Sequence, residues 1–397
     1  MDLTIEIFTT TIALAATFGH GQAIRGNAES VVVAASDGAT TGWGEGAPRR
    51  YVTGETLLGA ADALARHRPD EISAAVGAAS TFPQALDAVE AAALSERLGN
   101  AAACALETAL LDVILRRFGR PAADLLAWLD PRERLYLRRS RSVPYSYVVE
   151  SSRPVAEQLD VLAANSGTSP AVVKVKAHAD VGRTVADVRE IRATPITASA
   201  SIVIDANGIW DLSTCRGLQP IRDDLAWVEE PTRQRDWDEL AAIRRDTGLP
   251  VMLDESVTCI ADLNAAVGAG AVDLVNVRIS KFGGVIATSR AITKILRQGK
   301  RFQLGVQVAE VGPLWAFGRH LATHLRDPVA VEAGKQDSWF PTPTTTPPYF
   351  VDRREHLATP ITGIGSGVTP SAHLLAELVP YEPIADPADR NLERVVS

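Results

Sequence analysis

The stretch "AVVKVKAH", residues 171–178, combines the pattern of a buried strand with two lysines. Its valines predict a strand, and side chains alternate along a strand, so Lys174 and Lys176 project from the same face. Lysine is rarely buried without a partner of opposite charge. The stretch therefore requires acidic side chains that lie close to it in the folded chain.

Acidic residues stand at the ends of the three strands predicted next: Asp205 in "IDANG", Glu229 in "WVEEP" and Asp254 in "MLDES". Their intervals of 24 and 25 residues each fit one strand plus one helix. Each acid alone could equally cap the following helix. Together they predict one site, because converging carboxylates need a cation to stay ionised. Oxygen donors without histidine or cysteine favour Mg²⁺, with Mn²⁺ as the alternative.

Short apolar runs alternate with helical patterns from Val143 onward. The runs cover residues 143–149, 172–177, 202–205, 225–229, 251–254, 272–279, 302–308 and, weakly, 329–332, with helices predicted at 184–193, 237–247 and 285–299. This order predicts an α/β fold, a (β/α)8-type modified TIM barrel over residues 136–345. Chemistry in such a barrel lies at the carboxyl ends of the strands.

The first 135 residues follow a different pattern. Strands at 3–15 and 30–36 precede alanine-rich helices, the last at 101–118, and together they predict a separate N-terminal α+β domain. It contains two loops, at about 18–27 and 46–56. The proline- and threonine-rich residues 346–397 are expected to pack back on the other two parts.

The composition limits the class of partner. A net charge of −8 argues against nucleic acid and anionic membranes as partners. No run reaches the 18 apolar residues of a membrane span, and acidic Asp2 and Glu6 argue against a signal peptide. The cysteines, Cys104, Cys215 and Cys259, have no metal or disulfide spacing, which fits the cytoplasm.

Lys281, in "NVRISKFGG", follows the sixth predicted strand. The lysine pair lies one strand before the acids and Lys281 one strand after them, so they are expected to flank a bound ligand from opposite sides. A lysine near another cation has its neutral form favoured, as a general base requires. Alternatively, Lys281 is a surface lysine before a glycine turn, and Lys174 is an ion-pair partner of Glu255 or another acid.

The motifs "KVK", "DAN", "EEP", "DES" and "KFGG", with "GWGEG" and "ALETALLDVILRRFGRPAADLLA" before them, resemble the enolase superfamily. The resemblance covers most of the chain and is to the muconate-lactonizing-enzyme branch, which includes dipeptide epimerases. It implies that Asp205, Glu229 and Asp254 bind Mg²⁺ and that a substrate carboxylate completes the coordination. It further implies that Lys176 and Lys281 are an acid/base pair, assisted by Lys174, and that the protein is a homo-oligomer. Residues 1–135 would be a capping domain whose loops at about 18–27 and 46–56 determine the substrate.

Further candidates surround this group. Asn207, Glu255 and Glu310 are expected next to the metal and the lysines. The candidates for substrate binding are His20, Arg25, Arg50, Tyr51, Tyr147 (with Tyr145), Gln307 and Asp337. Gln307 and Glu310 stand where the mandelate-racemase branch has a histidine base, which argues against that branch. Asp337 is a lone acid where dipeptide epimerases have a pair.

The leading hypothesis is a racemase or epimerase of an amino-acid derivative or dipeptide, similar to L-Ala-D/L-Glu epimerase. It would remove the proton α to a carboxylate through an enediolate. The alternative is a cycloisomerase of the muconate-lactonizing type, or a syn-dehydratase of the o-succinylbenzoate-synthase type. A non-catalytic metal- or ligand-binding protein is a third hypothesis, and it predicts the loss of at least one of the five acids and lysines, all of which are present.

Overall fold

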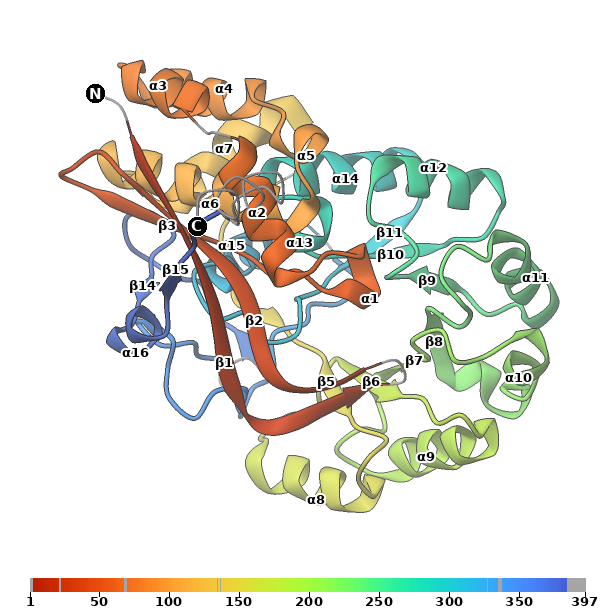
Figure 1. Cartoon of the computed structure of the whole chain (residues 1–397). Helices are drawn as coiled ribbons and strands as arrows, with labels where there is room; N and C mark the ends of the chain where they lie inside the picture. Colours follow the sequence, from red (N-terminus) through yellow and green to blue (C-terminus); the bar gives the residue numbers. More distant parts are fainter. Residues whose placement is uncertain are drawn as a thin grey trace, which may run out of the picture.

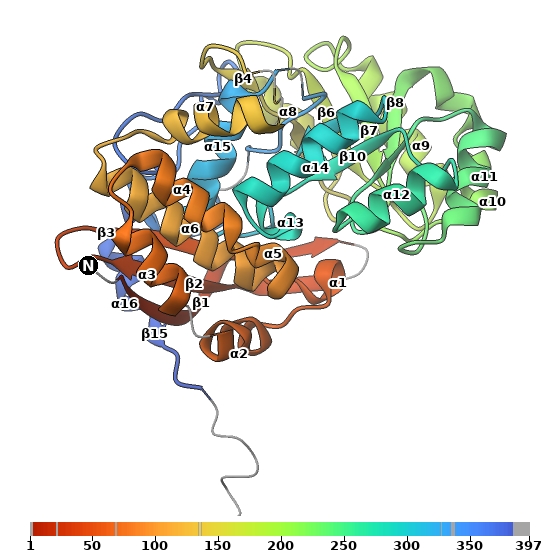
Figure 2. The ribbon, with the colours of Figure 1, turned by 90° about the horizontal axis from the view of Figure 1, so that it is seen from above.

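A computed structural model describes residues 3–20, 23–67, 70–133, 135, 137–326, 328–334 and 338–383, without the side chains of 17–20 and 23–25. The chain has two parts packed against each other (Figures 1 and 2). One is an antiparallel sheet with helices, here called the cap. The other is a ring of parallel strands with helices outside it. Both parts agree with the predicted fold class.

The cap sheet has the strand order β15-β1-β2-β3. Its strands are β1 (Thr4–His20), β2 (Ala23–Ser36), β3 (Thr41–Gly46) and β15 (Val379–Pro380). The hairpin β1–β2 is longer than predicted, so much of the expected first loop at 18–27 is strand. The strand β3 was not predicted. β15 pairs with β1 and brings the end of the described chain back to the cap.

Helix α6 (Asn100–Arg117) is the centre of the cap and agrees with the helix predicted at 101–118. The other cap helices are α1 (Arg50–Thr53), α2 (Leu57–His67), α3 (Asp70–Ala78), α4 (Phe82–Ala91), α5 (Leu94–Arg97) and α7 (Ala122–Glu133). A Cβ added at Gly42, Gly44 or Gly46 of β3 would lie 1.8–2.1 Å from the α6 backbone. The three glycines are therefore required for strand and helix to touch.

The barrel sheet has seven strands in the order β11-β10-β9-β8-β7-β6-β5, joined by parallel pairing. These are β5 (Tyr147–Val149), β6 (Val172–Lys176), β7 (Ser201–Asp205), β8 (Leu225–Glu229), β9 (Val251–Leu253), β10 (Leu274–Val277) and β11 (Arg301–Leu304). The eighth predicted run closes the ring, because Val331 bridges Leu304 and accepts the backbone N–H of Ser146 at 2.8 Å. The barrel is thus closed at a seam of few bonds.

Helices surround the barrel (Figure 2). They are α8 (Val155–Asn165), α9 (Val181–Ala193), α10 (Leu212–Arg216), α11 (Trp237–Thr247), α12 (Ile260–Gly268), α13 (Ile279–Phe282), α14 (Val285–Arg297) and α15 (Leu314–His324), with a 3₁₀ turn at Gln219–Asp224. Short elements complete the fold: β4 (Val143–Pro144), β12 (Thr345–Thr346), β13 (Leu357–Ala358), β14 (Thr369–Pro370) and α16 (Ala372–Ala376). The predicted helices at 184–193, 237–247 and 285–299 match α9, α11 and α14 within a few residues.

An apolar layer fills one level of the barrel interior. It consists of Val172, Val203, Trp227, Met252, Leu274 and Ala330, one from each of six strands or runs. Because every second residue of a strand faces the same way, the next inward residue on each strand forms the level above. On β6 that residue is Lys174, and on β8 it is Glu229. The charged site therefore rests directly on a closed apolar floor.

Buried carboxylates hold the cap to the barrel. Glu45 of β3 accepts the backbone N–H groups of Val311 and Gly312, both at 2.7 Å, just before α15. Glu107 of α6 accepts the backbone N–H of Ile286 at 3.0 Å in the first turn of α14. Burial raises the pKa of Glu45, and it raises the pKa of Glu107 to about 7. The interface is thus sensitive to the charge on these two side chains.

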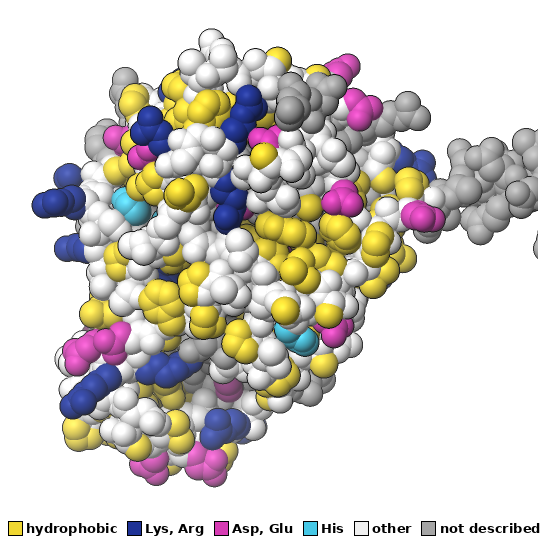
Figure 3. Space-filling view, turned by 90° about the vertical axis from the view of Figure 1, so that its left-hand side faces the viewer, with side chains coloured by type: hydrophobic (Ala, Val, Ile, Leu, Met, Phe, Trp, Pro, Cys, Tyr) yellow, Lys and Arg dark blue, Asp and Glu magenta, His cyan; other side chains and the backbone are white. Residues whose placement is uncertain are grey.

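None of the described helices is long and apolar enough to cross a membrane. On the face shown in Figure 3, lysine and arginine side chains are interspersed with acidic and hydrophobic ones.

The Glu107→Gln variant tests the interface. Because folding raises the pKa of Glu107, the folded state holds this proton more tightly than the unfolded chain. Stability therefore falls as the pH rises from about 4.5 to about 7, by roughly 3 kcal/mol. Glutamine carries no charge, so the variant should lose less stability than the parent between pH 5 and pH 8 in urea unfolding. Glu96→Gln, at an exposed position, is the control, and equal pH dependence of parent and Glu107→Gln would contradict the prediction.

Candidate active site

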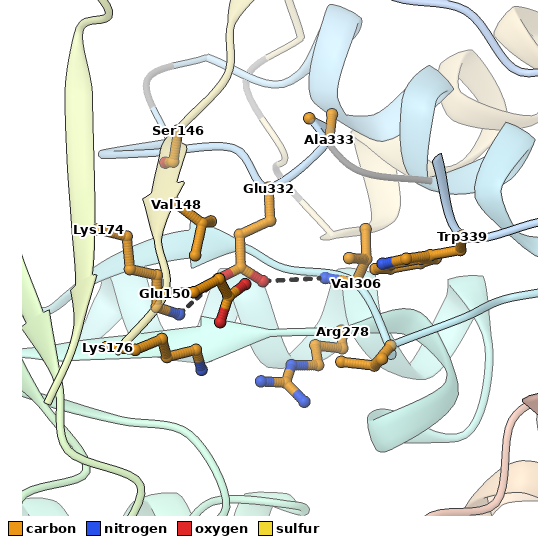
Figure 4. A pocket seen from close by; sticks show the side chains of 12 residues that line it. Ser146, Val148, Glu150, Lys174, Lys176, Arg278, Val306, Glu332, Ala333 and Trp339 are labelled. Atoms are coloured by element: carbon orange, nitrogen blue, oxygen red, sulfur yellow. Dashed lines mark hydrogen bonds and ion pairs between the residues drawn. The ribbon is translucent and has the colours of Figure 1, made fainter. Parts of the chain in front are cut away.

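A cavity opens inside the barrel above the apolar floor. The charged residues that line it are Glu150, Lys174, Lys176, Arg278 and Glu332. Figure 4 shows that Lys174 and Lys176 enter from one side and Arg278 from the other. Val148, Val306, Val308 and Trp339 contribute apolar surface, and Ser146 a hydroxyl. The cavity thus has a charged part, formed by these lysine, arginine and glutamate side chains, and a largely apolar wall.

Lys174 lies among three carboxylates. Its Nζ is 3.0 Å from Asp205 Oδ2, 3.0 Å from Glu229 Oε1 and 2.6 Å from Glu332 Oε1. Burial alone would lower the pKa of Lys174, but the charges of Asp205, Glu229 and Glu332 outweigh burial and raise it well above its usual value. Lys174 is therefore a fixed positive charge that balances these acids. Lys174 therefore has the ion-pair role that was the alternative from the sequence, but its partners are Asp205, Glu229 and Glu332 and not Glu255.

Lys176 is the more accessible of the two lysines, with 13% of its side chain exposed against 3% for Lys174. Its Nζ donates to Asp205 Oδ2 at 2.6 Å and to Asn207 Oδ1 at 3.1 Å. Burial lowers the pKa of Lys176, but the Asp205 carboxylate raises it by more, so the net shift of the pKa is upward. Asn207 in turn donates to Glu255 at 3.5 Å. Asn207 thus contacts Lys176 directly, and Glu255 lies next to Asn207.

Acidic side chains are crowded at this level of the barrel. The pKa of Glu229 is raised to about 8, mainly by burial. The charges of Asp205 and Asp254 raise this pKa further, and the charge of Lys174 lowers it. Burial also raises the pKa of Glu255 well above its usual value, and Asp254 adds to this effect. Glu255 Oε2 has no hydrogen-bond partner among the described residues. The group therefore holds more negative charge than its own cations neutralise, which a bound cation would relieve.

Asp254 lies between two cations. Lys281 Nζ donates to its Oδ1 at 2.9 Å, and Arg278 Nη2 contacts its Oδ2. Burial would raise the pKa of Asp254, but Arg278 and Lys281 outweigh burial and lower it. Arg278 also donates to Gln307 Oε1 at 3.0 Å. Asp254, which follows β9, is thus held in its charged form by Arg278 and Lys281.

Lys281 does not reach the cavity. Its side chain is fully buried, and its Nζ donates to the backbone carbonyls of Asp254 and Asn276 at 2.7 and 2.5 Å as well as to the Asp254 carboxylate. The expectation that Lys281 faces a ligand from the side opposite Lys176 is wrong. Lys281 lies in α13, beyond the end of β10, where the chain has already turned away from the interior. Its contacts indicate a structural role.

Arg278 has the position that was assigned to Lys281. Leu274 belongs to the apolar floor, so alternation along β10 and the residue after it directs Asn276 and then Arg278 inward. Lys174 and Lys176 follow Val172 in the same way on β6. In a ring of eight, β6 and β10 are four positions apart. Arg278 therefore faces the cavity across from Lys176.

The three predicted metal ligands are close to one another but turned toward lysine and arginine. Within the described ranges, no three His, Cys, Asp or Glu side chains lie close enough to hold a metal ion as they stand. The donor set nevertheless suits Mg²⁺ or Mn²⁺, because Asp205, Glu229 and Asp254 offer only carboxylate oxygens. Burial is the main cause of the raised pKa of Glu229, and Asp205 and Asp254 add to it, as expected for carboxylates that lie close together. These residues are compatible with a hard divalent cation.

The remaining candidates have mixed outcomes. Gln307 accepts a hydrogen bond from Arg278, and Glu310 accepts the backbone N–H of Gln307 at 2.8 Å, so both lie next to Arg278 without lining the cavity themselves. Tyr51 lies near Arg278. Arg50 is exposed at the start of α1, and no described contact brings it to the cavity.

Tyr147 does not line the cavity. Its hydroxyl donates to the Gln158 carbonyl at 2.9 Å, and its ring packs edge-on against His356, as does the ring of Tyr145. Both tyrosines face a recess outside the strand ring, because odd-numbered residues of β5 point away from the interior. The side chains of His20 and Arg25, and the whole of Asp337, lie outside the described residues.

Sequence reasoning missed Arg278, Glu332 and Asn276. Glu332 binds Lys174, and Asn276 Nδ2 donates to Glu229 Oε1 at 2.9 Å. The signal that could have found Arg278 and Asn276 was the strand alternation already used for the two lysines. Glu332 belonged to the weakest of the predicted strands.

Comparison with known proteins agrees with this geometry. Residues 155–374, more than half of the chain, match the family described as "Enolase C-terminal domain-like". The chain belongs to the enolase superfamily. A hydrophobic dipeptide epimerase of Enterococcus faecalis is 24% identical over 284 residues, which cover 71% of this chain and 75% of that protein.

Two solved structures share the fold of this enolase-superfamily enzyme. A dipeptide epimerase from Enterococcus faecalis, complexed with Mg and the dipeptide L-Leu-L-Tyr, has a TM-score of 0.75 at 19% identity and covers 93% of this chain and 100% of that chain. A 2-chloromuconate cycloisomerase from Rhodococcus opacus has a TM-score of 0.77 at 22% identity and covers 95% and 99%. The shared fold therefore includes enzymes of both reaction types considered above.

A comparison of Lys281→Met with Lys176→Met tests the assignment of Lys281 as structural. Lys281→Met removes a fully buried ammonium group with three acceptors and should cost about 3–5 kcal/mol of unfolding free energy. Lys176→Met should cost clearly less, because Asp205 keeps Lys174 as a partner. Urea unfolding of the metal-free proteins measures both. An equal loss in the two variants would show that Lys281 has no special structural role.

Proposed function

We propose that this enzyme removes the proton α to a carboxylate, with Lys176 as the base and Asp205, Glu229 and Asp254 as ligands of Mg²⁺. The observation that carries the proposal is the meeting of these carboxylates with Lys174 and Lys176 in one buried level beneath a cavity. No such concentration of charge is needed to stabilise a barrel, because buried ion pairs contribute little net stability.

Each residue has a distinct part in this chemistry. Lys174 is held by three carboxylates and orients Asp205 and Glu229. Lys176 points into the cavity and carries the amine that would accept the proton. A bound Mg²⁺ would supply positive charge that favours the neutral amine of Lys176 and stabilises the negative charge developing on the substrate carboxylate. The apolar walls exclude water from the reacting carbon.

The presence of Arg278, and not a second lysine, across the cavity from Lys176 helps to choose between the candidate reactions. A guanidinium group stays protonated at neutral pH and does not accept a proton from carbon. With Lys176 on one face and Arg278 on the other, the proton would leave and return on the same face. This geometry favours the cycloisomerase or syn-dehydratase alternative over an epimerase with two lysines.

The epimerase hypothesis remains a second candidate, with a dipeptide or an N-acylated amino acid as the substrate. It is favoured by the similarity to the hydrophobic dipeptide epimerase, which spans most of both chains. The two candidates differ in stereochemistry. One-face chemistry returns deuterium with retention, whereas epimerisation returns it with inversion.

Proton exchange in D₂O tests the base. With Mg²⁺ and a panel of N-acylated amino acids and dipeptides, NMR should show Cα deuteration with retention of configuration. Lys176→Ala should lower the exchange rate by at least about 10²-fold, as expected for loss of a general base. Arg153→Ala, in the recess outside the barrel, should exchange at the parent rate. Exchange that persists in Lys176→Ala would refute the role of Lys176, and inversion would favour the epimerase.

Metal binding can be tested separately from turnover. Glu229→Gln and Asp254→Asn each remove one proposed ligand charge and should weaken Mn²⁺ binding by at least about tenfold, measured by electron paramagnetic resonance of free Mn²⁺. Glu150→Gln removes an acid that lines the cavity without being a proposed ligand, so it is the matched control. Unchanged affinity in Glu229→Gln and Asp254→Asn would place the cation elsewhere.

A further inference from the structure

Arg278 lines the cavity across from Lys176, and it and the neighbouring Gln307 carry buried hydrogen-bond donors that lack acceptors among the described residues. Arg278 is 7% exposed, and although Nη1 and Nη2 are bonded to Gln307 and Asp254, its Nε has no partner. Gln307 is 1% exposed, and its Nε2 also has no partner. Buried donors in native proteins are nearly always satisfied. A ligand in the cavity would supply the missing acceptor.

These donors are held firmly in place. Gln307 is fixed through its side-chain oxygen by Arg278 and through its backbone N–H by Glu310 at 2.8 Å. Arg49 of the cap binds the carbonyl of the neighbouring Val308 through Nη2 at 2.5 Å. The segment that carries Gln307 is therefore fixed from both the barrel and the cap. Rigid donors of this kind recognise an acceptor at a defined position.

The surface next to the donors is apolar. Val148, Val306, Val308 and Trp339 line the same cavity as Arg278. Trp339 adds an indole N–H that has no partner among the described residues. A ligand that matches this wall has an apolar body with an oxygen acceptor attached to it.

We infer that Arg278, held in place by Gln307, binds a second acceptor oxygen of the substrate, separate from the carboxylate whose α-proton Lys176 removes. This oxygen belongs to an amide carbonyl or to a second carboxylate on an apolar body. The inference rests on the proposed function, because it places the substrate between Lys176 and the donors. Arg278 is thus a positioning residue that holds the reacting carbon against Lys176.

Three probes that share a benzyl group and a carboxylate test the inference by isothermal titration calorimetry on the full Mg²⁺-loaded protein. N-acetyl-L-phenylalanine carries an amide carbonyl, benzylsuccinate a second carboxylate, and 3-phenylpropionate neither. At least one of the first two should bind about tenfold more tightly than 3-phenylpropionate, as expected for one charge-assisted hydrogen bond. In Arg278→Met that preference should fall to within about twofold. Arg153→Met, a matched arginine substitution outside the cavity, should keep it.

The outcomes separate the inference from the proposed function. Equal affinity of the three probes for the parent, or a preference that survives in Arg278→Met, overturns the inference and leaves the role of Lys176 intact. Failure of all three to bind in the presence of Mg²⁺ overturns both. If Arg278→Met disturbs Asp254, Arg278→Lys keeps a positive charge there but lacks the Nε–H of the guanidinium. It should also lose the preference, and retention of the preference in it would contradict the inference.

Discussion

The ammonium group of Lys174 and its three carboxylates are the interaction on which the barrel interior depends. Asp205 and Glu229 come from the two strands after β6, and Glu332 comes from the run that closes the ring. One buried cation therefore connects neighbouring strands to the seam. Removal of the Lys174 ammonium group would leave buried carboxylates without the cation that they share, which is far more costly than the loss of a surface ion pair. Stability alone does not require this arrangement, so its retention points to chemistry.

The cap extends this constraint to the loops around the cavity. Its buried carboxylates Glu45 and Glu107 accept backbone N–H groups at the starts of α15 and α14. Arg49, also fully buried, binds the carbonyl of Val308. The cap thus determines where Val308 and the adjacent Gln307 lie, although neither belongs to it. Residues far from the reacting carbon thereby fix the shape of the wall that a substrate would meet.

Most of the fold could be predicted from the sequence where a local pattern coincides with a tertiary constraint. The strand predicted at 225–229 is observed with both ends correct, because its apolar run ends in the acid that faces the cavity. The strand β3 was missed, since "TGWGEG" has the composition of a loop. Its glycines are explained only by contact with α6, which lies more than fifty residues later in the chain.

The candidate site also has residues that could be predicted from local sequence patterns and residues that could not. The two lysines of β6 and their acidic partners followed from alternation and from regular intervals along the chain. Lys281 was misplaced because a motif at the end of a strand was given more weight than the alternation of the strand itself, which directs Arg278 inward. Glu332 could not be assigned with the same force, since the run around it is short and is joined to its neighbours by few hydrogen bonds.

The sparse closure at Val331 has an evolutionary consequence. A strand in a long ladder cannot change length without shifting the register of its neighbours, whereas, among the described residues, the run 329–332 is joined by only three backbone hydrogen bonds to β11 and one to Ser146. Its register is fixed over these few residues and not beyond them. Ala333 and Gly334, which follow the run and line the cavity, are therefore where descendants of this chain could acquire new substrates with the least damage to folding.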